Sequence, residues 1–179
     1  MSQPHDSATA TPQGRPKAGP APSGGSEPRE AGSVGALFTW PVRVYWEDTD
    51  AGGIVFYANY LKFFERARTE WLRALGVEQQ RLREQLGGMF VVTQTQLHYH
   101  RPARLDDLLL VTARVVEAGR ASMTIEQTAL LKPQQNDAAS GEPAQLLCSG
   151  TIRIGWVDDR QLRPQRIPPA VMAALKLPL

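Results

Sequence analysis

The chain has 179 residues, of which 42% are hydrophobic and 21% are charged, and its formal net charge at pH 7 is +2. This composition is typical of one globular domain with or without a tail, and the charge is too balanced to favour DNA or RNA as the main partner. The single cysteine excludes an internal disulfide framework, and no apolar run is long enough for a transmembrane helix or a secretory signal. The predicted location is therefore the cytoplasm.

The N-terminal segment differs in composition from the rest of the chain. Residues 1–36 contain six of the 14 prolines and no aromatic residue. Such a segment cannot bury enough apolar surface to offset the entropy that is lost when its backbone is ordered. We therefore predict a disordered tail over residues 1–37 and one folded domain over residues 38–179, which is long enough to bury a sizeable core.

The folded part begins with a strand pattern over residues 40–47, in which apolar and polar side chains alternate. A turn rich in Asp and Gly follows over residues 48–53. The clearest helical pattern then starts near Tyr57 or Ala58 and runs to residue 75, because its apolar residues recur at helical spacing. Gly76 provides the expected stop.

The remaining elements are mostly strands. The patterns predict a short helix over residues 77–86, strands over 89–100, 108–117, 122–132 and 146–157, a tight turn at Gly119 and Arg120, a polar loop over 134–144 and a final short helix over 168–175. Successive strands after one helix favour an α+β fold, with an antiparallel five-stranded sheet packed on the long helix. A doubly wound parallel sheet would need alternating helices, which the pattern lacks.

The turn before the long helix is the strongest candidate site. Asp48 and Asp50 lie in it, and the backbone N–H groups of the helix start directly after it. Such N–H groups can bind an oxyanion or a polarised carbonyl, and a carboxylate beside them can act as nucleophile or general base. The alternative is that both aspartates only cap the turn and the helix.

Metal sites are poorly supported by the sequence. A calcium loop would place Asp48 and Asp50 at positions 1 and 3, but Gly52 and Asn59 then stand where an oxygen ligand and a bidentate Glu are required. His98 and His100 share one strand face without a third zinc ligand nearby. No metal and no cofactor are expected.

The sequence gives little support for a cysteine or serine nucleophile or for a phosphate-binding loop. Cys148 follows two leucines inside a predicted strand, which favours a buried and inert thiol. Neither a Gly-x-Ser-x-Gly elbow nor a Gly-Lys-Ser/Thr phosphate loop occurs in the sequence.

One long segment carries a family resemblance. Residues 42–71, VRVYWEDTDAGGIVFYANYLKFFERARTEW, resemble the signature of the 4-hydroxybenzoyl-CoA thioesterase family, and within it the YbgC-type acyl-CoA thioesterases associated with the Tol–Pal system. YHRPARLDD at 99–107 and RPQRIP at 163–168 extend the match over essentially all of residues 40–170. The resemblance implies the hotdog fold, whose antiparallel sheet wraps around one long helix. It also implies a homodimer with joined sheets, commonly assembled into a homotetramer, and active sites at the dimer interface beside the helix N-terminus.

The resemblance assigns roles to five residues. Asp50 matches the catalytic aspartate, and the backbone N–H of Tyr57 matches the group that polarises the thioester carbonyl. Gly53 in the same turn, with Arg120 and Arg163, is implied in substrate binding; the arginines resemble residues that hold the nucleotide end of coenzyme A.

The resemblance also shows a departure. YbgC-type members often have His at the position of Tyr57, whereas the hydroxybenzoyl-CoA branch has Tyr, so a histidine-assisted mechanism is not implied here. Some hotdog thioesterases use an acid at the position of Glu65, but in this chain we expect Glu65 to pair with Arg68 or Thr69 on the same helix face.

The predicted function is an acyl-CoA thioesterase that converts acyl-CoA and water into a carboxylic acid and CoA, with Asp50 as nucleophile or general base. The alternative is an interaction protein associated with the Tol–Pal system and phospholipid synthesis, which binds acyl carrier protein and hydrolyses thioesters only incidentally. A hotdog hydratase is disfavoured, because such enzymes generally use His and no His lies between residues 6 and 97.

Overall fold

The computed structural model describes residues 35–133 and 144–177. Nearly all of the predicted tail and of the predicted loop over 134–144 lie outside these residues. Five strands form one antiparallel sheet in the order β1-β3-β4-β5-β2. The strands are β1 (Phe38–Arg43), β2 (Gly88–Tyr99), β3 (Leu108–Ala118), β4 (Ser122–Leu131) and β5 (Gln145–Asp158).

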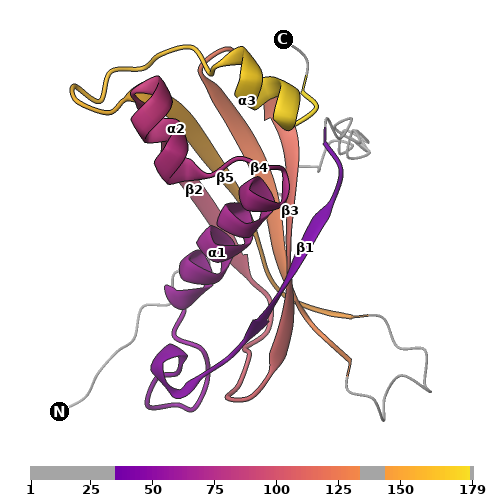
Figure 1. Ribbon diagram of the computed structural model, residues 1–179. Coiled ribbons are helices and arrows are strands. Elements are labelled where there is room, and N and C mark those ends of the chain that lie inside the picture. Colours follow the sequence, from indigo (N-terminus) through magenta and orange to yellow (C-terminus); the bar gives the residue numbers. More distant parts are fainter. Residues whose placement is uncertain (1–34, 134–143, 178–179) are drawn as a thin grey trace, which may run out of the picture.

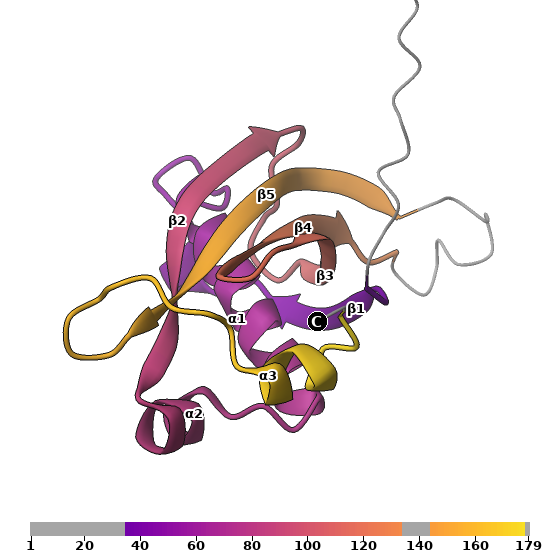
Figure 2. The same ribbon diagram turned by 90° about the horizontal axis from the view of Figure 1, so that it is seen from above.

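The sheet curls around the long helix α1 (Asn59–Ala74), which lies against its concave face (Figure 2). The helix buries the apolar side chains Tyr60, Phe63, Phe64, Ala67, Trp71 and Leu72. Each large apolar side chain that is fully buried contributes about 1.5–3 kcal/mol to stability, so this face fixes α1 on the sheet. The α+β architecture with a five-stranded antiparallel sheet and one long helix is confirmed.

The two ends of the sheet carry different structures. The short helices α2 (Gln79–Leu86) and α3 (Pro169–Ala174) lie at one end, and the turn before α1 lies at the other (Figure 1). Arg43 at the end of β1 pairs with Leu108 at the start of β3. The 11 residues of β3 then span about 35 Å before the turn to β4, so that turn lies at the opposite end from the start of α1.

The first strand ends earlier than predicted. The sequence pattern predicted a strand over residues 40–47, but β1 ends at Arg43 and a 3-10 helix, η1 (Trp46–Asp48), follows. The carboxylate of Asp48 accepts a hydrogen bond from the backbone N–H of Tyr45 at 3.0 Å, so that N–H is not free for a strand partner. The alternation of apolar and polar residues in the sequence therefore continues through Tyr45 and Trp46 although the strand has ended. Both side chains are exposed.

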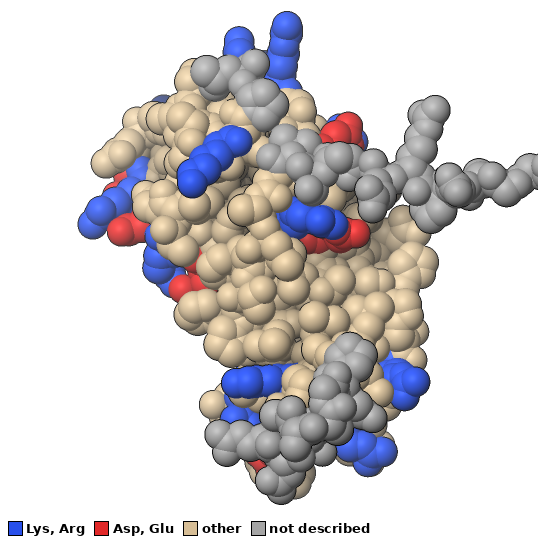
Figure 3. Space-filling model, turned by 90° about the vertical axis from the view of Figure 1, so that its right-hand side faces the viewer, with Lys and Arg blue, Asp and Glu red and all other residues tan. Residues whose placement is uncertain are grey.

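Charged side chains are unevenly spread over one face of the molecule. On the side that forms the right of Figure 1, Lys and Arg gather toward the two ends, whereas the middle carries few charges (Figure 3). In the described ranges, no helix is both long and apolar enough to cross a membrane.

Candidate active site

A tight turn between β1 and α1 carries Asp50. The backbone N–H of Asp50 donates to the carbonyl of Ile54 at 2.9 Å, and the N–H of Gly53 donates to the carbonyl of Asp50 at 3.0 Å. The N–H of Gly52 donates to Oδ1 of Asp50 at 2.8 Å, which orients the carboxylate. Oδ2 accepts no hydrogen bond from any described residue, so one oxygen of this exposed carboxylate is free to react.

Gly53 has a backbone conformation that suits glycine. Its φ is +72°, in the left-handed region that other residues adopt at a cost. A Cβ at this position would meet no atom within 4 Å. The requirement is therefore conformational, and the space beside the turn is open.

Asp48 anchors this turn to α1. The residue is 1% exposed, and its carbonyl oxygen accepts from the backbone N–H of Phe56 and from Nδ2 of Asn59, both at 2.9 Å. Its carboxylate is the group that caps η1. The two acids of the turn thus differ: Asp48 has the capping role that the sequence left open, whereas Asp50 points a free oxygen to solvent.

The start of α1 offers unused hydrogen-bond donors. Its N-cap residue, Ala58, provides no side-chain cap, and the first turn contains no acidic residue. The backbone N–H groups of Tyr57 and Ala58 donate to no acceptor within the described ranges. Free N–H groups at the positive end of a helix dipole are suited to bind an oxyanion.

The side chain of Tyr57 lies exposed at the mouth of this region. Its ring is 62% exposed and packs against Phe56, with ring centroids 4.6 Å apart, and edge-on against Tyr99 at 6.3 Å. The hydroxyl of Tyr99 donates to the carbonyl oxygen of Tyr57 at 3.2 Å. These contacts hold the ring and the carbonyl of Tyr57 in place.

A buried tyrosine supports the same region from beneath. The hydroxyl oxygen of Tyr60 accepts from the N–H of Ala103 at 3.1 Å. Burial raises the pKa of Tyr60, so its hydroxyl stays neutral at physiological pH. This hydrogen bond ties the first turn of α1 to the segment between β2 and β3.

The predicted substrate-binding arginines lie at the other end of the sheet. Arg120 is in the turn between β3 and β4, and its carbonyl accepts from the N–H of Ile167 at 2.8 Å. Arg120 and Arg166 line one cleft of about 190 Å³. Arg163 does not line that cleft; its carbonyl accepts from the N–H of Asp158. One chain therefore groups Asp50, Gly53 and Tyr57 at one end and the arginines at the other.

Arg166 was missed by the sequence analysis. It belongs to the RPQRIP segment that carries part of the family resemblance, and that segment was the available signal. Two arginines beside one cleft form a favourable site for the phosphates of a nucleotide.

The other candidate residues have structural surroundings. His100 Nε2 lies 2.9 Å from the hydroxyl of Ser149, and no group of three metal-ligating side chains occurs among the described residues. Cys148 is fully buried, as predicted, and burial raises the pKa of its thiol to about 12. Glu65 pairs, as expected, with both Arg68 and Thr69.

Comparisons with known proteins show which family the chain belongs to. Residues 52–137 match the family model of the Thioesterase superfamily. The chain is 42% identical over 137 residues to the acyl-CoA thioesterase YbgC of Haemophilus influenzae, and the match covers 76% of this chain and 93% of that protein.

Solved structures show the same fold. A probable thioesterase from Bartonella henselae is 30% identical, with a TM-score of 0.66 over 74% of this chain and 100% of that chain. A variant of 4-hydroxybenzoyl-CoA thioesterase in complex with 4-hydroxybenzoyl-CoA has a TM-score of 0.69 at 18% identity, over 78% of this chain and 98% of that chain, and it supports the fold alone. The hotdog fold is thus confirmed, and the chain belongs to the thioesterase superfamily, within its YbgC family of acyl-CoA thioesterases.

Proposed function

We propose that this chain hydrolyses acyl-CoA thioesters to a free carboxylic acid and CoA at a site built on Asp50 and Tyr57. One observation carries the proposal: a carboxylate with a free oxygen lies in a turn that is hydrogen-bonded to the start of a helix with open N–H groups. The printed name of the Haemophilus influenzae relative supports acyl-CoA as the substrate class.

The chemistry follows from these groups. Oδ2 of Asp50 either attacks the thioester carbon, which forms a mixed anhydride that water then hydrolyses, or removes a proton from an attacking water molecule. The N–H of Tyr57 donates to the oxygen that becomes negatively charged, and such a donor typically lowers the barrier by about 3 kcal/mol. The C–S bond breaks, and the CoA sulfur leaves with the electron pair and takes up a proton. Because the donor is a backbone group, this step does not depend on the side chain at position 57, where YbgC-type members often have His.

We also propose that a complete site is shared by two chains. Asp50 and the Arg120–Arg166 cleft lie at opposite ends of the sheet, and β3 alone spans about 35 Å between those ends. β2 is an edge strand of the sheet, and its outer edge pairs with no other strand among the residues that the structure describes. Antiparallel pairing of two β2 edges would bring one end of each sheet toward the opposite end of its partner. Arg120, Arg163 and Arg166 would then hold CoA phosphates, while Gly53 leaves space for the thioester beside Asp50.

The test is steady-state hydrolysis of acyl-CoAs from short to long aliphatic and to hydroxybenzoyl, with a reporter of released CoA. We expect kcat/KM above about 10⁴ M⁻¹s⁻¹ for at least one class in the unmodified chain. Asp50→Asn should lose activity by about 10³-fold or more with an unchanged melting temperature. Asp159→Asn removes a partly exposed carboxylate paired with Arg83 at the far end and is the control. Equal activity of Asp50→Asn and Asp159→Asn would refute the role of Asp50.

The same panel separates the alternative function. Feeble turnover of every acyl-CoA, together with tight capture of acyl carrier protein by Asp50→Asn, would favour an interaction protein. The cytoplasmic location, the homotetramer and the association with the Tol–Pal system stay predictions from the family resemblance.

A further inference from the structure

One peptide group at the start of α1 has a hydrogen bond that does not belong to the helix. The carbonyl of Tyr57 accepts from the hydroxyl of Tyr99, the last residue of β2, at 3.2 Å. No backbone N–H of the described residues donates to this carbonyl, and the N–H of Leu61 donates to the carbonyl of Ala58 instead. The side chain of Tyr99 thus replaces the backbone donor that an α-helix would provide four residues further on.

This hydrogen bond also orients an N–H group. The carbonyl of Tyr57 and the N–H of Ala58 belong to the same peptide group, which is planar and trans, so they point in opposite directions. Ala58 has helical backbone angles, with φ of −72° and ψ of −19°, and the N–H groups of a helix point toward its N-terminus. By holding the carbonyl, Tyr99 therefore aims the N–H of Ala58 out of the start of α1.

The N–H of Ala58 is available for a ligand. It donates to no acceptor within the described ranges, and it directly follows the N–H of Tyr57, the donor of the proposed function. The next N–H group, that of Asn59, is already used, because it donates to the carbonyl of Phe56 at 2.8 Å. Two successive free N–H groups at the positive end of a helix dipole can donate to one oxygen.

The ring of Tyr99 is held by two other tyrosines. It packs edge-on against Tyr57 and Tyr60, with ring centroids 6.3 Å and 5.8 Å apart. Tyr60 is itself fixed, because it is 3% exposed and its hydroxyl accepts from the N–H of Ala103. Partial burial raises the pKa of Tyr99 above its ordinary value of 10.0, so the hydroxyl stays protonated and can donate at physiological pH.

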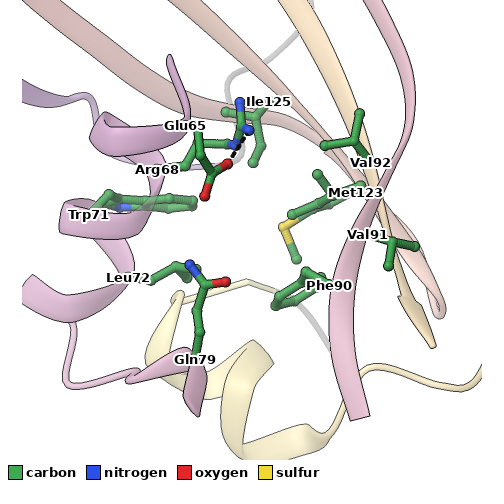
Figure 4. A pocket seen from close by; sticks show the side chains of 11 residues that line it. Glu65, Arg68, Trp71, Leu72, Gln79, Phe90, Val91, Val92, Met123 and Ile125 are labelled. Atoms are coloured by element: carbon green, nitrogen blue, oxygen red, sulfur yellow. Dashed lines mark hydrogen bonds and ion pairs between the residues drawn. The ribbon is translucent and has the colours of Figure 1, made fainter. Parts of the chain in front are cut away.

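The rest of α1 does not depend on Tyr99. Further along the helix, Arg68 donates to the fully buried Gln127 at 2.7 Å and pairs with Glu65 (Figure 4). Trp71 points toward the side chains that the sheet contributes (Figure 4). Loss of the Tyr99 hydroxyl would therefore leave the helix in place and release only the peptide group at its start.

We propose that Tyr99 is a positioning residue, which holds the Tyr57–Ala58 peptide group so that the N–H of Ala58 is a second donor to the thioester oxygen. The inference rests on the proposed function. It adds a second donor and the side chain that aims this donor, although that side chain lies on a different element.

The hydrogen bond from Tyr99 is suited to strengthen during the reaction. Its distance of 3.2 Å is longer than the usual value of about 2.7–2.8 Å between two oxygens. When the N–H of Ala58 donates to an oxygen that becomes negatively charged, the peptide group is polarised and its carbonyl becomes a better acceptor. Tyr99 therefore stabilises the transition state more than the bound substrate, and its effect falls on kcat.

The first test is Tyr99→Phe, which removes the hydroxyl and keeps the ring. We expect kcat to fall about 10-fold with little change in KM or in the melting temperature, because the second donor is misaligned and not lost. Tyr45→Phe is the matched control: Tyr45 is 59% exposed and Tyr99 is 50% exposed, and Tyr45 also lies near the turn that carries Asp50. Equal kcat values for Tyr99→Phe and Tyr45→Phe, with Asp50→Asn inactive, would overturn the inference and leave the proposed function intact.

The infrared band of a bound thioester carbonyl is a readout that a merely structural role would not move. Donors to the carbonyl oxygen lower its stretching frequency, and a ¹³C label identifies the band in the Asp50→Asn complex with acyl-CoA. We expect the frequency in Asp50→Asn/Tyr99→Phe to lie between that in Asp50→Asn and that of free acyl-CoA. Asp50→Asn/Tyr45→Phe should match Asp50→Asn, and one frequency for all three proteins would refute the role of Tyr99.

The infrared measurement separates the two proposals because it needs no turnover. If the unmodified chain hydrolyses no acyl-CoA, the proposed function fails. A frequency that is lowered only while Tyr99 keeps its hydroxyl would still support the second donor. A bound carbonyl with the frequency of free acyl-CoA would refute both N–H donors, whatever the rate of hydrolysis.

Discussion

The side chain of Asn59, the first residue of α1, donates from Nδ2 to the carbonyl oxygen of Asp48 at 2.9 Å. Asn59 is 6% exposed and Asp48 is 1% exposed, so the hydrogen bond is shielded from water. It joins the helix that supplies the N–H donors to the turn that carries Asp50. The relative position of carboxylate and donors therefore depends in part on one buried amide, together with the hydrogen bond from the Phe56 N–H to the same carbonyl.

Asn59→Ala should lower both stability and activity. It leaves the buried carbonyl of Asp48 with one hydrogen bond fewer, and we expect the free energy of unfolding to fall by about 1–3 kcal/mol. We expect kcat to fall as well, because the turn with Asp50 loses one of its two hydrogen-bonded ties to the helix start. Urea denaturation and steady-state kinetics measure the two effects. Gln80→Ala is the control, since Nε2 of Gln80 donates only to the exposed Glu84, and it should change stability by less than about 0.5 kcal/mol.

Periodicity predicted most of the fold correctly, because it reports which face of an element is buried. The apolar spacing of residues 57–75 predicted α1, and alternation predicted four of the five strands to within two residues. The exception is the end of β1. There the alternation continues through Trp46, but the carboxylate of Asp48 captures the N–H of Tyr45, and no pattern of hydrophobicity reports that hydrogen bond.

The candidate site was only partly predictable for a related reason. Asp50 and Tyr57 lie in one continuous segment, so the motif brings them together. Arg120 and Arg166 are 46 residues apart in sequence, and only the register of β3 and the return of the chain after β5 bring them to one cleft. Gln127 has no local signal at all, because a glutamine inside a strand looks like a surface residue until its position on the concave face is known.

Arg120→Ala and Arg166→Ala should each raise KM for acyl-CoA several-fold, with little change in kcat. Both side chains line the cleft proposed for the CoA phosphates, far from the reacting carbon. The difference from the unmodified chain should shrink at high salt, because screening weakens the attraction of exposed charges. Arg160→Ala removes an exposed arginine that does not line the cleft. A KM for Arg160→Ala as high as that for Arg166→Ala would show a general charge effect and not a specific cleft.

Gly150→Ala should destabilise the pairing of β5 with β2. A Cβ at position 150 would lie 2.6 Å from the carbonyl oxygen of Gln96 and overlap the side chain of Leu97, so the strands would have to separate. We expect a loss of about 1–3 kcal/mol, as for overpacking in a core.

The control for Gly150→Ala is Gly155→Ala in the same strand. A Cβ at position 155 would lie 3.4 Å from the Thr93 side chain, close to ordinary contact distance. Urea denaturation should give a clearly higher free energy of unfolding for Gly155→Ala than for Gly150→Ala. Equal free energies of unfolding for the two variants would mean that β2 and β5 can move apart at position 150 at little cost, contrary to the close spacing of their backbones.

We expect Cys148 to make the protein less stable in alkaline solution. We also expect the thiol of Cys148 to be unreactive near neutral pH. Burial raises the pKa of the thiol from an ordinary value of 9.0 to about 12. Below pH 9 the thiol is protonated in both folded and unfolded chains. Between pH 9 and 12 the unfolded chain loses this proton while the folded chain keeps it, so the free energy of unfolding falls as pH rises, by up to about 1.4 kcal/mol per pH unit.

Cys148→Ala tests this linkage. Tyr60, whose pKa is raised by burial and also by a charge on Cys148, contributes to the alkaline loss in both chains, so the difference between their pH profiles reports Cys148 together with its coupling to Tyr60. We expect a shallower decline for Cys148→Ala above pH 9. The chain has a single cysteine, so a thiol reagent should find about one reactive group in denaturant and almost none in the folded protein at pH 8. Rapid labelling of the folded chain would show that β5 opens readily at Cys148, and it would contradict the burial that raises the pKa.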